Sequence, residues 1–407
     1  MEYYFTEIDK FIMKIQILEY PKDIQDKVLY LLQDGKRLRP ILCIIFSGLQ
    51  YNDKNNNDNK KLIYNIASFI EQIHCLSLVL DDLPEMDNDL IRRGRHSFHY
   101  KYTTVYTNFF IYYMFNRLFL SLNSVLDGSL NSKINNLENN LENNLENNLE
   151  NNLEIVNRIH KLLSYNLNLL IDGQYNDCSF FEKYNNKSKN NIKITENIIE
   201  TVNDSINEKQ NKSYNSQTLQ TLQLSQFVDE IDIILELLEK NDKLDTNALE
   251  LLIIDNIDLN IKKTSSLFNL SVCSGFLLQI WTNKYNLEKH NDIYIKLGIW
   301  ANILGYMFQI SDDILDEDED KVKGNPNICH IIGKEKTYIL LTNGCKWLIN
   351  TINKINLDCN CNCNCNFNCN CNCNCNCNCN CNCNLDNKII FNLDAINEIV
   401  DKILKRK

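Results

Sequence analysis

An apolar stretch of the sequence, IHCLSLVL, runs directly into two adjacent carboxylates, Asp81 and Asp82. Pro84 lies two residues after Asp82, so a helix formed by this stretch is expected to end there. Asp87 lies three residues beyond the proline. The spacing therefore predicts that three carboxylates converge at one helix end.

A second apolar stretch, GYMFQIS, precedes Asp312, Asp313 and Asp316. In a helix Asp312 and Asp316 lie one above the other, and like charges at that spacing repel each other unless a cation lies between them. Carboxylate oxygens that fill only part of a cation's shell suit Mg²⁺ shared with substrate phosphates. One such cluster alone would be interpreted as a solvated helix end. Two clusters, each preceded by residues of a buried type, favour a metal site.

Two basic segments accompany these acids: GKRLRP at residues 35–40 and RRGR at residues 92–95. Lysine offers a compact charge and arginine a planar fork, and both bind phosphate oxygens. A basic cluster by itself is usually an exposed surface. Beside two acidic clusters, it predicts a diphosphate that is held both through a metal ion and by cationic side chains.

The elements that position these residues are predicted to be helices. The chain has 407 residues, 44% of them hydrophobic, which is enough for a large core. It contains only 4 prolines and 11 glycines, too few for a β architecture punctuated by turns. The sequence therefore predicts an all-α fold.

Charge and hydropathy exclude several classes of partner. The chain has 42 Lys+Arg against 53 Asp+Glu, a net charge of −11, which argues against a nucleic-acid groove. Its N-terminus lacks the basic-then-apolar pattern of a signal peptide. The longest uncharged stretch outside the repeats runs from Thr264 to Asn283 and is interrupted by polar residues. We interpret it as a buried core helix and not a membrane span.

Three low-complexity segments are interpreted as insertions into a single domain that spans residues 1–407. Residues 135–154 repeat Asn-Asn-Leu-Glu, and a four-residue step makes the leucines spiral around any helix. Residues 182–244 are polar at first and then include a short amphipathic stretch, VDEIDIILELLEK. Residues 359–384 alternate Cys with Asn, and that single-residue spacing does not fit the usual zinc-ligand pattern.

The motifs resemble those of the trans-prenyltransferases, or polyprenyl synthetases, most nearly the geranylgeranyl diphosphate synthases. DDLPEMDND followed by RRG is similar to the family's first aspartate-rich motif, FQISDDILD to the second, and GKRLRP to its homoallylic-substrate motif. They occur in the family's order. DGQYND, which contains Gly173, Gln174 and Asp177, and the pair Lys263 and Thr264 resemble two further motifs.

The resemblance implies a single large helical bundle of the isoprenoid synthase type around a central cavity. It also implies condensation of isopentenyl diphosphate with an allylic diphosphate to give a longer trans-polyprenyl diphosphate, geranylgeranyl or longer. Two or three Mg²⁺ ions, with Mn²⁺ as an alternative, would bridge the allylic diphosphate. Ionisation of the allylic C–O bond would precede attack by the isopentenyl double bond and proton loss.

Carried over by position, the resemblance implies a role for each motif residue. Mg²⁺ would be bound by Asp81, Asp82, Asp87, Asp312, Asp313 and Asp316. The allylic diphosphate would be held by Arg92, Lys263 and Lys323, and isopentenyl diphosphate by Lys36, Arg39, His74 and Arg93. Thr264 and Gln309 would place polar oxygens near the carbocation, so that Lys263, Thr264 and Gln309 form the catalytic group.

Product length is predicted from positions one turn before the first carboxylates. Leu76 and Ser77 lie five and four residues before Asp81, which places them about 6 to 7.5 Å down a helix from the metal site. They would form the floor of the hydrocarbon pocket. Neither is aromatic, which favours a product of C20 or longer.

The sequence departs from the family's pattern at several positions, and this leaves two alternatives open. The Gly-Asp pair expected after the first motif is missing, Asn260 stands where a histidine is usual, and Ser265 replaces a common glycine. A non-catalytic regulatory subunit of a heteromeric prenyltransferase would tolerate these changes but would have little reason to keep six aspartates. A terpene cyclase would not need GKRLRP. The family expectation is a homodimer that does not span a membrane, in the cytoplasm by default or in a plastid-type organelle.

Overall fold

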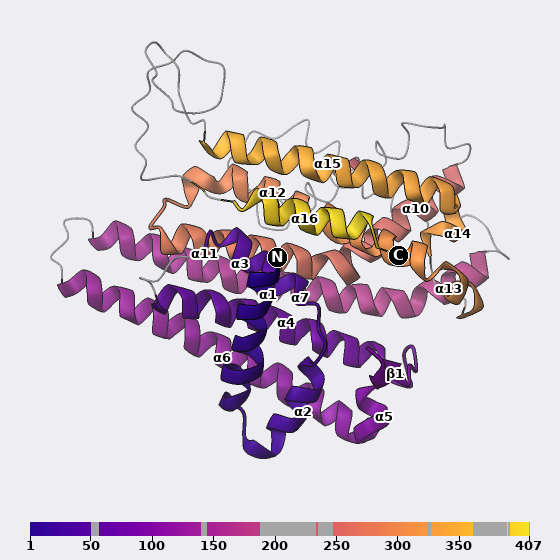
Figure 1. Cartoon of the computed structure of the whole chain (residues 1–407), viewed down its shortest axis with the longest axis horizontal. Coiled ribbons are helices and arrows are strands. Elements are labelled where there is room, and N and C mark those ends of the chain that lie inside the picture. Colours follow the sequence, from indigo (N-terminus) through magenta and orange to yellow (C-terminus); the bar gives the residue numbers. More distant parts are fainter. Residues whose placement is uncertain are drawn as a thin grey trace, which may run out of the picture. The chain divides into compact units, whose positions relative to one another are not determined.

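The computed structural model describes residues 1–49, 57–139, 145–187, 233–234, 247–323, 327–360, 389 and 391–406. Apart from one short hairpin, the regular structure of these residues is helical, which confirms the predicted all-α class (Figure 1). The elements are α1 (Glu2–Lys10), η1 (Phe11–Ile15), η2 (Gln16–Glu19), α2 (Lys22–Leu32), α3 (Leu38–Phe46), α4 (Asn57–Asp81), β1 (Ile91–Arg92), β2 (Arg95–His96), α5 (Phe98–Tyr102), α6 (Thr104–Asn139), α7 (Leu145–Lys187), α10 (Asn247–Asn260), η3 (Ile261–Ser265), α11 (Ser266–Thr282), η4 (Glu288–His290), α12 (Asn291–Leu315), α13 (Glu317–Lys323), α14 (Ile328–Ile332), α15 (Lys334–Asn360) and α16 (Leu393–Leu404).

The chain divides into two compact units. Unit 1 consists of Met1–Ser164, Leu270–Asn291 and Asn356–Ile396. Unit 2 consists of Tyr165–Asn269, Asp292–Ile355 and Asn397–Lys407. Each acidic cluster belongs to a different unit: the first lies in unit 1 and the second in unit 2.

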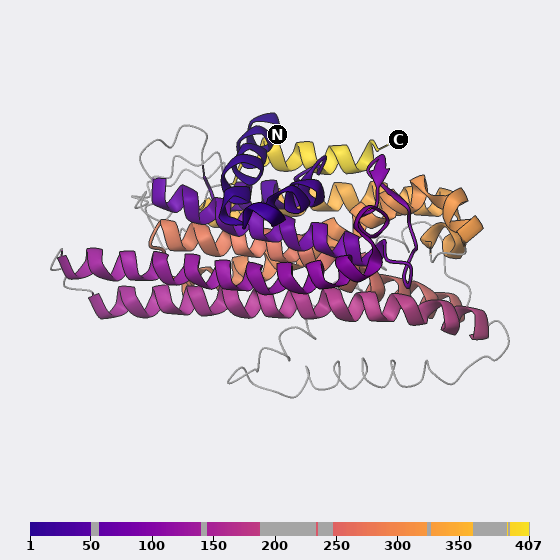
Figure 2. The same ribbon diagram turned by 90° about the horizontal axis from the view of Figure 1, so that it is seen from below.

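The core of unit 1 is built around α4. Helix α4 packs along α6 (Figure 2). The rings of Phe69 and Phe119 meet there edge to face, with centroids 5.9 Å apart. Helix α11 approaches α3 closely at Gly275, where an added Cβ would lie 2.4 Å from the carbonyl oxygen of Cys43. Side chains from Leu270 to Trp281 are buried, so the predicted core helix is confirmed.

Helix α4 is also the only described helix whose length and hydropathy would permit a membrane span. The candidate segment is Asp58–Asp81, and 83% of its apolar window is buried inside the structure. That burial is what the central helix of a packed core requires, because its apolar faces contact neighbouring helices on all sides. We interpret α4 as a core helix.

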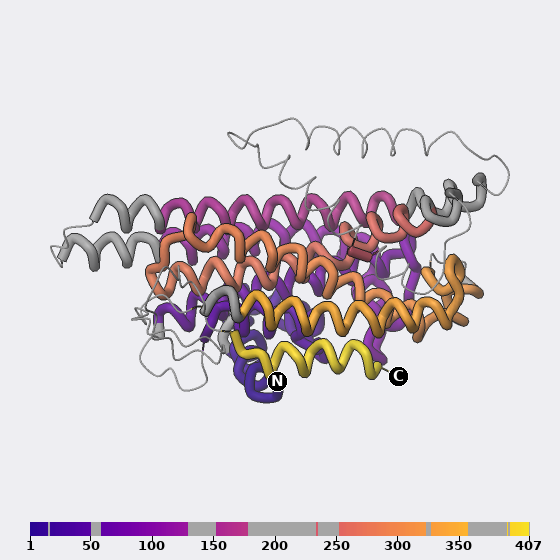
Figure 3. The backbone as a smooth tube through the Cα atoms, turned by 90° about the horizontal axis from the view of Figure 1, so that it is seen from above, coloured from indigo at the N-terminus to yellow at the C-terminus, as the bar shows by residue number. Residues whose placement is uncertain are grey.

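The core of unit 2 is built around α12. Trp300 is fully buried and its indole N–H donates to the carbonyl oxygen of Leu348 on α15 at 2.9 Å. The hydroxyl of Tyr306 donates to Asn256 on α10 at 3.2 Å. Helix α16 runs alongside α15 (Figure 3). The carbonyl oxygen of Ile403 on α16 accepts a hydrogen bond from the Ser311 hydroxyl of α12 at 3.0 Å.

The three predicted insertions lie partly or wholly outside the described residues. Within the first, residues 135–139 continue α6 and residues 145–154 begin α7 as helix. Of the second, residues 182–187 end α7, and only residues 233–234 are described beyond it. Of the third, residues 359–360 end α15 and the rest lie outside the described residues. Their interpretation as insertions into one domain stays a prediction.

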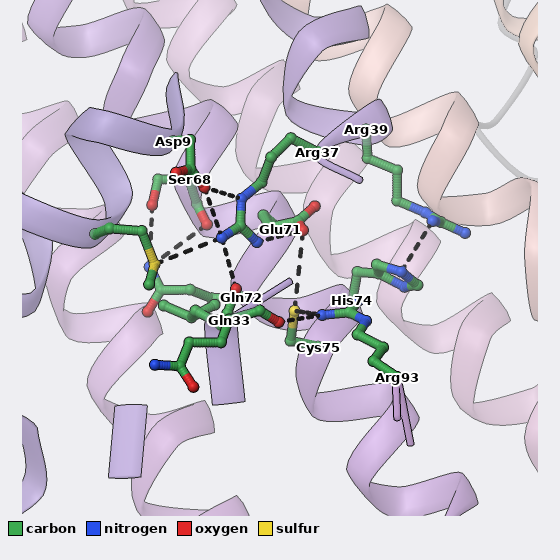
Figure 4. Close-up of polar contacts among 12 residues, drawn as sticks. Asp9, Gln33, Arg37, Arg39, Ser68, Glu71, Gln72, His74, Cys75 and Arg93 are labelled. Atoms are coloured by element: carbon green, nitrogen blue, oxygen red, sulfur yellow. Dashed lines mark hydrogen bonds and ion pairs between the residues drawn. The ribbon is translucent and has the colours of Figure 1, made fainter. Parts of the chain in front are cut away.

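A buried ion pair anchors the segment GKRLRP in unit 1. Arg37 is 1% exposed and its guanidinium contacts Glu71, itself 2% exposed, at 2.9 Å (Figure 4). The same guanidinium donates to Asp9 at 3.0 Å and to the carbonyl oxygen of Leu32 at 2.6 Å. One of the three cations of this segment therefore points into the core, and its charge is satisfied there.

Removing one partner of this pair is expected to destabilise the fold strongly. Arg37→Met leaves the Glu71 carboxylate buried without its cation, which costs about 3–5 kcal/mol of the free energy of unfolding. Urea unfolding followed by circular dichroism measures the loss. Lys36→Met, a change at the exposed neighbour, is the control and should shift stability by less than about 0.5 kcal/mol. A double variant, Arg37→Met with Glu71→Leu, should recover part of the loss, and no recovery would contradict this account.

Candidate functional site

The first acidic cluster lies at the C-terminal end of α4, but its three carboxylates are not gathered into a metal-binding group in the described part of the chain. Asp81 is the last helical residue, and the chain turns back so that the Asp87 N–H donates to the Asp81 carbonyl oxygen at 2.9 Å. The Asp81 side chain is half-buried and that of Asp87 is exposed. Asp82 differs from both, because only 2% of it is exposed.

Asp82 is held by an arginine from the hairpin. Arg92 donates to the Oδ1 atom of Asp82 from its Nε at 2.7 Å and also from a terminal nitrogen, and it reaches Asp89 at 3.1 Å. Burial raises the pKa of Asp82, although hydrogen bonds from Arg92 act in the opposite direction. The arrangement fixes where the Arg92 guanidinium lies beside Asp81.

A second cationic group lies two turns earlier on α4. Arg39, at the start of α3, places a guanidinium nitrogen 3.1 Å from the Nε2 atom of His74 (Figure 4). Arg93 donates to the carbonyl oxygen of Gln33 at 3.1 Å. Burial, and then Arg39 and Arg93, hold the pKa of His74 well below its usual range. The ring is therefore neutral at neutral pH and can accept from a cation.

The remaining positions named from the first motif and from GKRLRP fall on the same unit. Lys36 is exposed, one residue before the buried Arg37. On α4, Leu76 is fully buried, and the Ser77 hydroxyl donates to the His74 carbonyl oxygen at 2.9 Å. Unit 1 thus brings together the predicted isopentenyl diphosphate residues Arg39, His74 and Arg93.

The second acidic cluster lies at the end of α12, in unit 2. Asp313 is 4% exposed; its two oxygens accept from the Ile328 N–H at 3.0 Å and from Gln309 at 2.8 Å. Burial raises the pKa of Asp313 to about 7, against these two hydrogen bonds. Asp316 lies one residue past the helix, and its N–H donates to the Asp312 carbonyl oxygen at 2.9 Å.

A residue that the sequence analysis did not assign contacts this second cluster. Arg406, just beyond α16, places a guanidinium nitrogen 2.6 Å from Asp312 and stacks on the Phe308 ring at 4.4 Å. The only sequence feature that could have indicated this contact is the basic segment KILKRK, which contains Arg406. Its distance along the sequence from Asp312 gave no reason to pair the two.

Lys263 and Thr264 lie in a π-helical turn, η3. Such turns insert one extra residue into a helix and are frequent at functional sites. Lys263 forms an ion pair with Asp177 of α7 at 2.5 Å, and the Thr264 hydroxyl donates to Gln309 at 2.8 Å. Close approach of α7 is possible because residue 173 is glycine: an added Cβ would lie 2.5 Å from the Lys263 nitrogen.

These contacts connect three sequence motifs within unit 2. Thr264, Gln309 and Asp313 form a continuous chain of hydrogen bonds. Asp177, which was noted in DGQYND but given no role, proves to be the partner of Lys263. Lys323 ends α13, and its side chain lies outside the described residues.

The donor chemistry of both clusters suits a hard divalent cation. Asp81, Asp87, Asp312 and Asp316 offer carboxylate oxygens that are exposed or half-buried. Across the part of the chain that the structure describes, no three His, Cys, Asp or Glu side chains are gathered into a metal-binding group. Mg²⁺ keeps water and substrate phosphates in its shell and needs few protein ligands, so the chemistry of each pair, Asp81 with Asp87 and Asp312 with Asp316, fits this ion.

A model of the polyprenyl synthetase family matches residues 21–209 of the chain. Residues 21–209 are therefore similar to polyprenyl synthetases. The matched segment contains GKRLRP, the first acidic cluster and DGQYND, whereas the second acidic cluster lies beyond it.

Curated relatives are geranylgeranyl diphosphate synthases. The chain is 44% identical over 69 residues to geranylgeranyl pyrophosphate synthase 10, mitochondrial, of Arabidopsis thaliana, covering 17% of this chain and 18% of the relative. It is 40% identical over 83 residues to the enzyme of Cyanophora paradoxa, covering 20% and 26%. The chloroplastic enzyme of Capsicum annuum is 37% identical over 93 residues, covering 23% and 24%. These alignments span about a quarter or less of each relative's own length.

Solved structures are similar in fold to this chain over a far larger share of its length than the sequence alignments cover. The geranyltransferase from Helicobacter pylori 26695 covers 99% of this chain and 97% of its own, with a TM-score of 0.55 at 16% identity. A structure of the geranyltransferase from Helicobacter pylori complexed with magnesium and isoprenyl diphosphate covers 87% and 90%, with a TM-score of 0.52 at 18% identity. At this identity the likeness establishes the fold, and the predicted isoprenoid synthase type of fold is confirmed.

The depressed pKa of His74 makes stability depend on pH. An unfolded histidine takes up a proton below about pH 6.5, whereas the folded ring resists protonation, so stability is retained above that pH and is lost as the pH falls below it. The free energy of unfolding of the wild type should therefore fall between pH 6.5 and 5. Urea unfolding of wild type and His74→Gln measures it as a difference. His330→Gln, at an exposed histidine, is the control; parallel curves for wild type and His74→Gln would contradict the assignment.

Proposed function

We propose that this chain is a Mg²⁺-dependent trans-prenyltransferase that condenses isopentenyl diphosphate with an allylic diphosphate. One observation carries the proposal: helix α4 bears His74, paired with Arg39 at 3.1 Å, and ends two turns later in Asp81. A single rigid element thus holds a cationic group suited to one diphosphate at a fixed distance from carboxylates suited to a metal-bound second diphosphate.

The proposed isopentenyl diphosphate site consists of Lys36, Arg39, His74 and Arg93. Two guanidinium groups and an exposed ammonium supply the positive charge, and the neutral His74 accepts from Arg39 and so orients its fork. Because Arg39 is almost buried, a phosphate there would be bound away from bulk water, where each charge-assisted hydrogen bond is strongest.

For the allylic diphosphate we propose the acidic cluster and Arg92 of unit 1, and the acidic cluster, Lys263 and Lys323 of unit 2. Mg²⁺ bound there would stabilise the negative charge of the departing diphosphate. We propose that Asp81, Asp87, Asp312 and Asp316 contribute the metal-facing oxygens. Asp82 and Asp313, although they belong to the same motifs, would act by holding Arg92 and the start of α14, since these are the groups they contact. We expect the site to bind two or three Mg²⁺ ions, with Mn²⁺ as an alternative metal.

Thr264 and Gln309 are proposed to face the carbocation. The Thr264 hydroxyl donates its proton to the Gln309 side-chain oxygen at 2.8 Å, and the Gln309 amide nitrogen donates in turn to Asp313. These hydrogen bonds fix the orientation of both oxygens. Lys263, neutralised in part by Asp177, would then move toward the diphosphate when substrate arrives. With Leu76 and Ser77 as the floor of the pocket, a product of C20 or longer is proposed.

We also propose a homodimer that forms through α6. Four large apolar side chains lie at helical spacing on one face of this helix and are largely exposed, by 69%, 72%, 72% and 56%: Val105, Phe109, Tyr112 and Leu120. Burying such a stripe releases ordered water, whereas leaving it in solvent favours aggregation.

Neither a regulatory subunit nor a terpene cyclase is favoured by any contact described above. The compartment stays a prediction, since similar enzymes are chloroplastic or mitochondrial.

The enzyme proposal predicts Mg²⁺-dependent elongation. Purified protein, incubated with farnesyl diphosphate and labelled isopentenyl diphosphate, should give a product of C20 or longer that is lost with EDTA. Asp81→Ala should lower kcat by about a hundredfold or more, because a metal-facing charge is removed. Asp127→Ala, at an exposed site on α6, is the matched control. A folded wild type that elongates nothing would refute the proposal and redirect the search to a partner subunit.

The dimer proposal predicts that a single charge on α6 separates the subunits. Phe109→Glu places a carboxylate in the middle of the apolar stripe, where its burial against a second copy would be costly. Sedimentation equilibrium should show a dimer for wild type and a monomer for the variant. Leu18→Glu, at a side chain that is 70% exposed on η2, should leave the dimer intact. A dimer in the Phe109 variant would exclude this face.

A further inference from the structure

Arg95 lies in the hairpin, beside the two arginines of the RRG motif. The hairpin pairs β1 with β2 in the register Arg92↔Arg95, and its turn consists of Arg93 and Gly94, both with positive φ. Arg95 is not among the residues that the family motif assigns to substrate. Its side chain leaves the hairpin and reaches the end of α2.

Arg95 contacts the chain directly before GKRLRP through both terminal nitrogens of its guanidinium. It donates to the Gln33 side chain at 2.6 Å and to the Gln33 carbonyl oxygen at 3.2 Å. It reaches the Tyr30 carbonyl oxygen at 3.4 Å and stacks on the Tyr30 ring at 4.6 Å. Its Nε lies 3.1 Å from a carboxylate oxygen of Asp34.

These contacts satisfy groups that a helix end leaves without partners. The last carbonyl oxygens of a helix have no acceptor role inside it and favour a cation nearby. Asp34 has a φ of 59°, a left-handed conformation that needs support in a residue other than glycine. The Tyr30 hydroxyl returns the contact by donating to the His96 carbonyl oxygen at 2.6 Å.

The same helix end also receives Arg93, which donates to the Gln33 carbonyl oxygen at 3.1 Å (Figure 4). Gln33 is thus shared by Arg93 and Arg95, and Lys36 follows three residues later. Two groups of cations from distant parts of the sequence, Lys36 with Arg39 and Arg92 with Arg93, are joined at this point.

We propose that Arg95 is a positioning residue that sets the distance between these two groups of cations, and thereby the affinity for isopentenyl diphosphate. The inference rests on the proposed function. Arg95 does not contact the diphosphate, because both terminal nitrogens of its guanidinium donate to Gln33 and Tyr30. Its effect would pass through the loop that carries Lys36 and through Arg93.

The test compares binding of isopentenyl diphosphate, by isothermal titration calorimetry, with steady-state kinetics. Arg95→Gln should weaken binding and raise KM for isopentenyl diphosphate about tenfold to a hundredfold, with much less change in kcat or in KM for the allylic substrate. Arg95→Lys should restore part of the affinity, since it keeps the ion pair with Asp34 but not the fork over Gln33. Lys101→Gln is the matched control: it removes another cation from the same Tyr30 ring, 3.5 Å from its centroid.

Asp34→Asn distinguishes positioning from direct binding. The side chain of Asp34 is 64% exposed, so the variant is expected to fold. If Arg95 bound diphosphate directly, removing this neighbouring negative charge would leave affinity unchanged or increase it. Positioning predicts weaker binding instead, and a double variant with Arg95→Gln no weaker than Arg95→Gln alone.

Three results would overturn the inference. Unchanged affinity in Arg95→Gln, or unchanged or tighter binding in Asp34→Asn, would do so while leaving the enzyme proposal intact. A folded wild type that neither binds isopentenyl diphosphate nor elongates a substrate would overturn the proposed function first and this inference with it.

Discussion

The buried pair between Arg37 and Glu71 is the constraint on which the cationic half of the site depends. A guanidinium that is 1% exposed cannot be left without its carboxylate, so the chain at GKRLRP has one permitted orientation. With Arg37 directed inward to α4 and α1, Lys36 on one side of it is exposed. Arg39 on the other side, at the start of α3, reaches His74. The burial of Arg37 thus leaves Lys36 exposed to solvent and Arg39 in contact with His74.

A similar division occurs within each pair of adjacent aspartates. Successive residues of a helix point about 100° apart, so at a helix end one carboxylate faces solvent while its neighbour faces the core. Asp82 and Asp313 are the inward members, and hydrogen bonds stabilise each buried carboxylate. Asp82 accepts from Arg92, and Asp313 accepts from the Ile328 N–H and from Gln309. We propose that the outward members supply most of the charge that a metal would meet, while the inward members hold Arg92 and the start of α14.

The contrast between short sequence matches and an extensive structural match has a physical cause. A helical fold needs only apolar residues at helical spacing, which many sequences supply, so a structure 16% identical covers 99% of the chain. Alignments to geranylgeranyl diphosphate synthases cover 17% to 23% of it. Binding of diphosphate and metal requires particular side chains at fixed positions. Three of the motifs, GKRLRP, DDLPEMDND and DGQYND, lie in the matched segment, residues 21–209.

The sequence by itself determined the helical class, the core helix that follows Thr264, and the family motifs, because these depend on local periodicity and on residue type. It could not show that Arg37 is buried, that Asp177 pairs with Lys263, or that Arg406 reaches Asp312. Each of these pairs joins residues far apart in the chain, and a charged side chain carries no local signal of whether it faces solvent or a partner. Only the tertiary structure decides that, since burying a charge is permitted where packing brings an opposite charge or a polar group within reach.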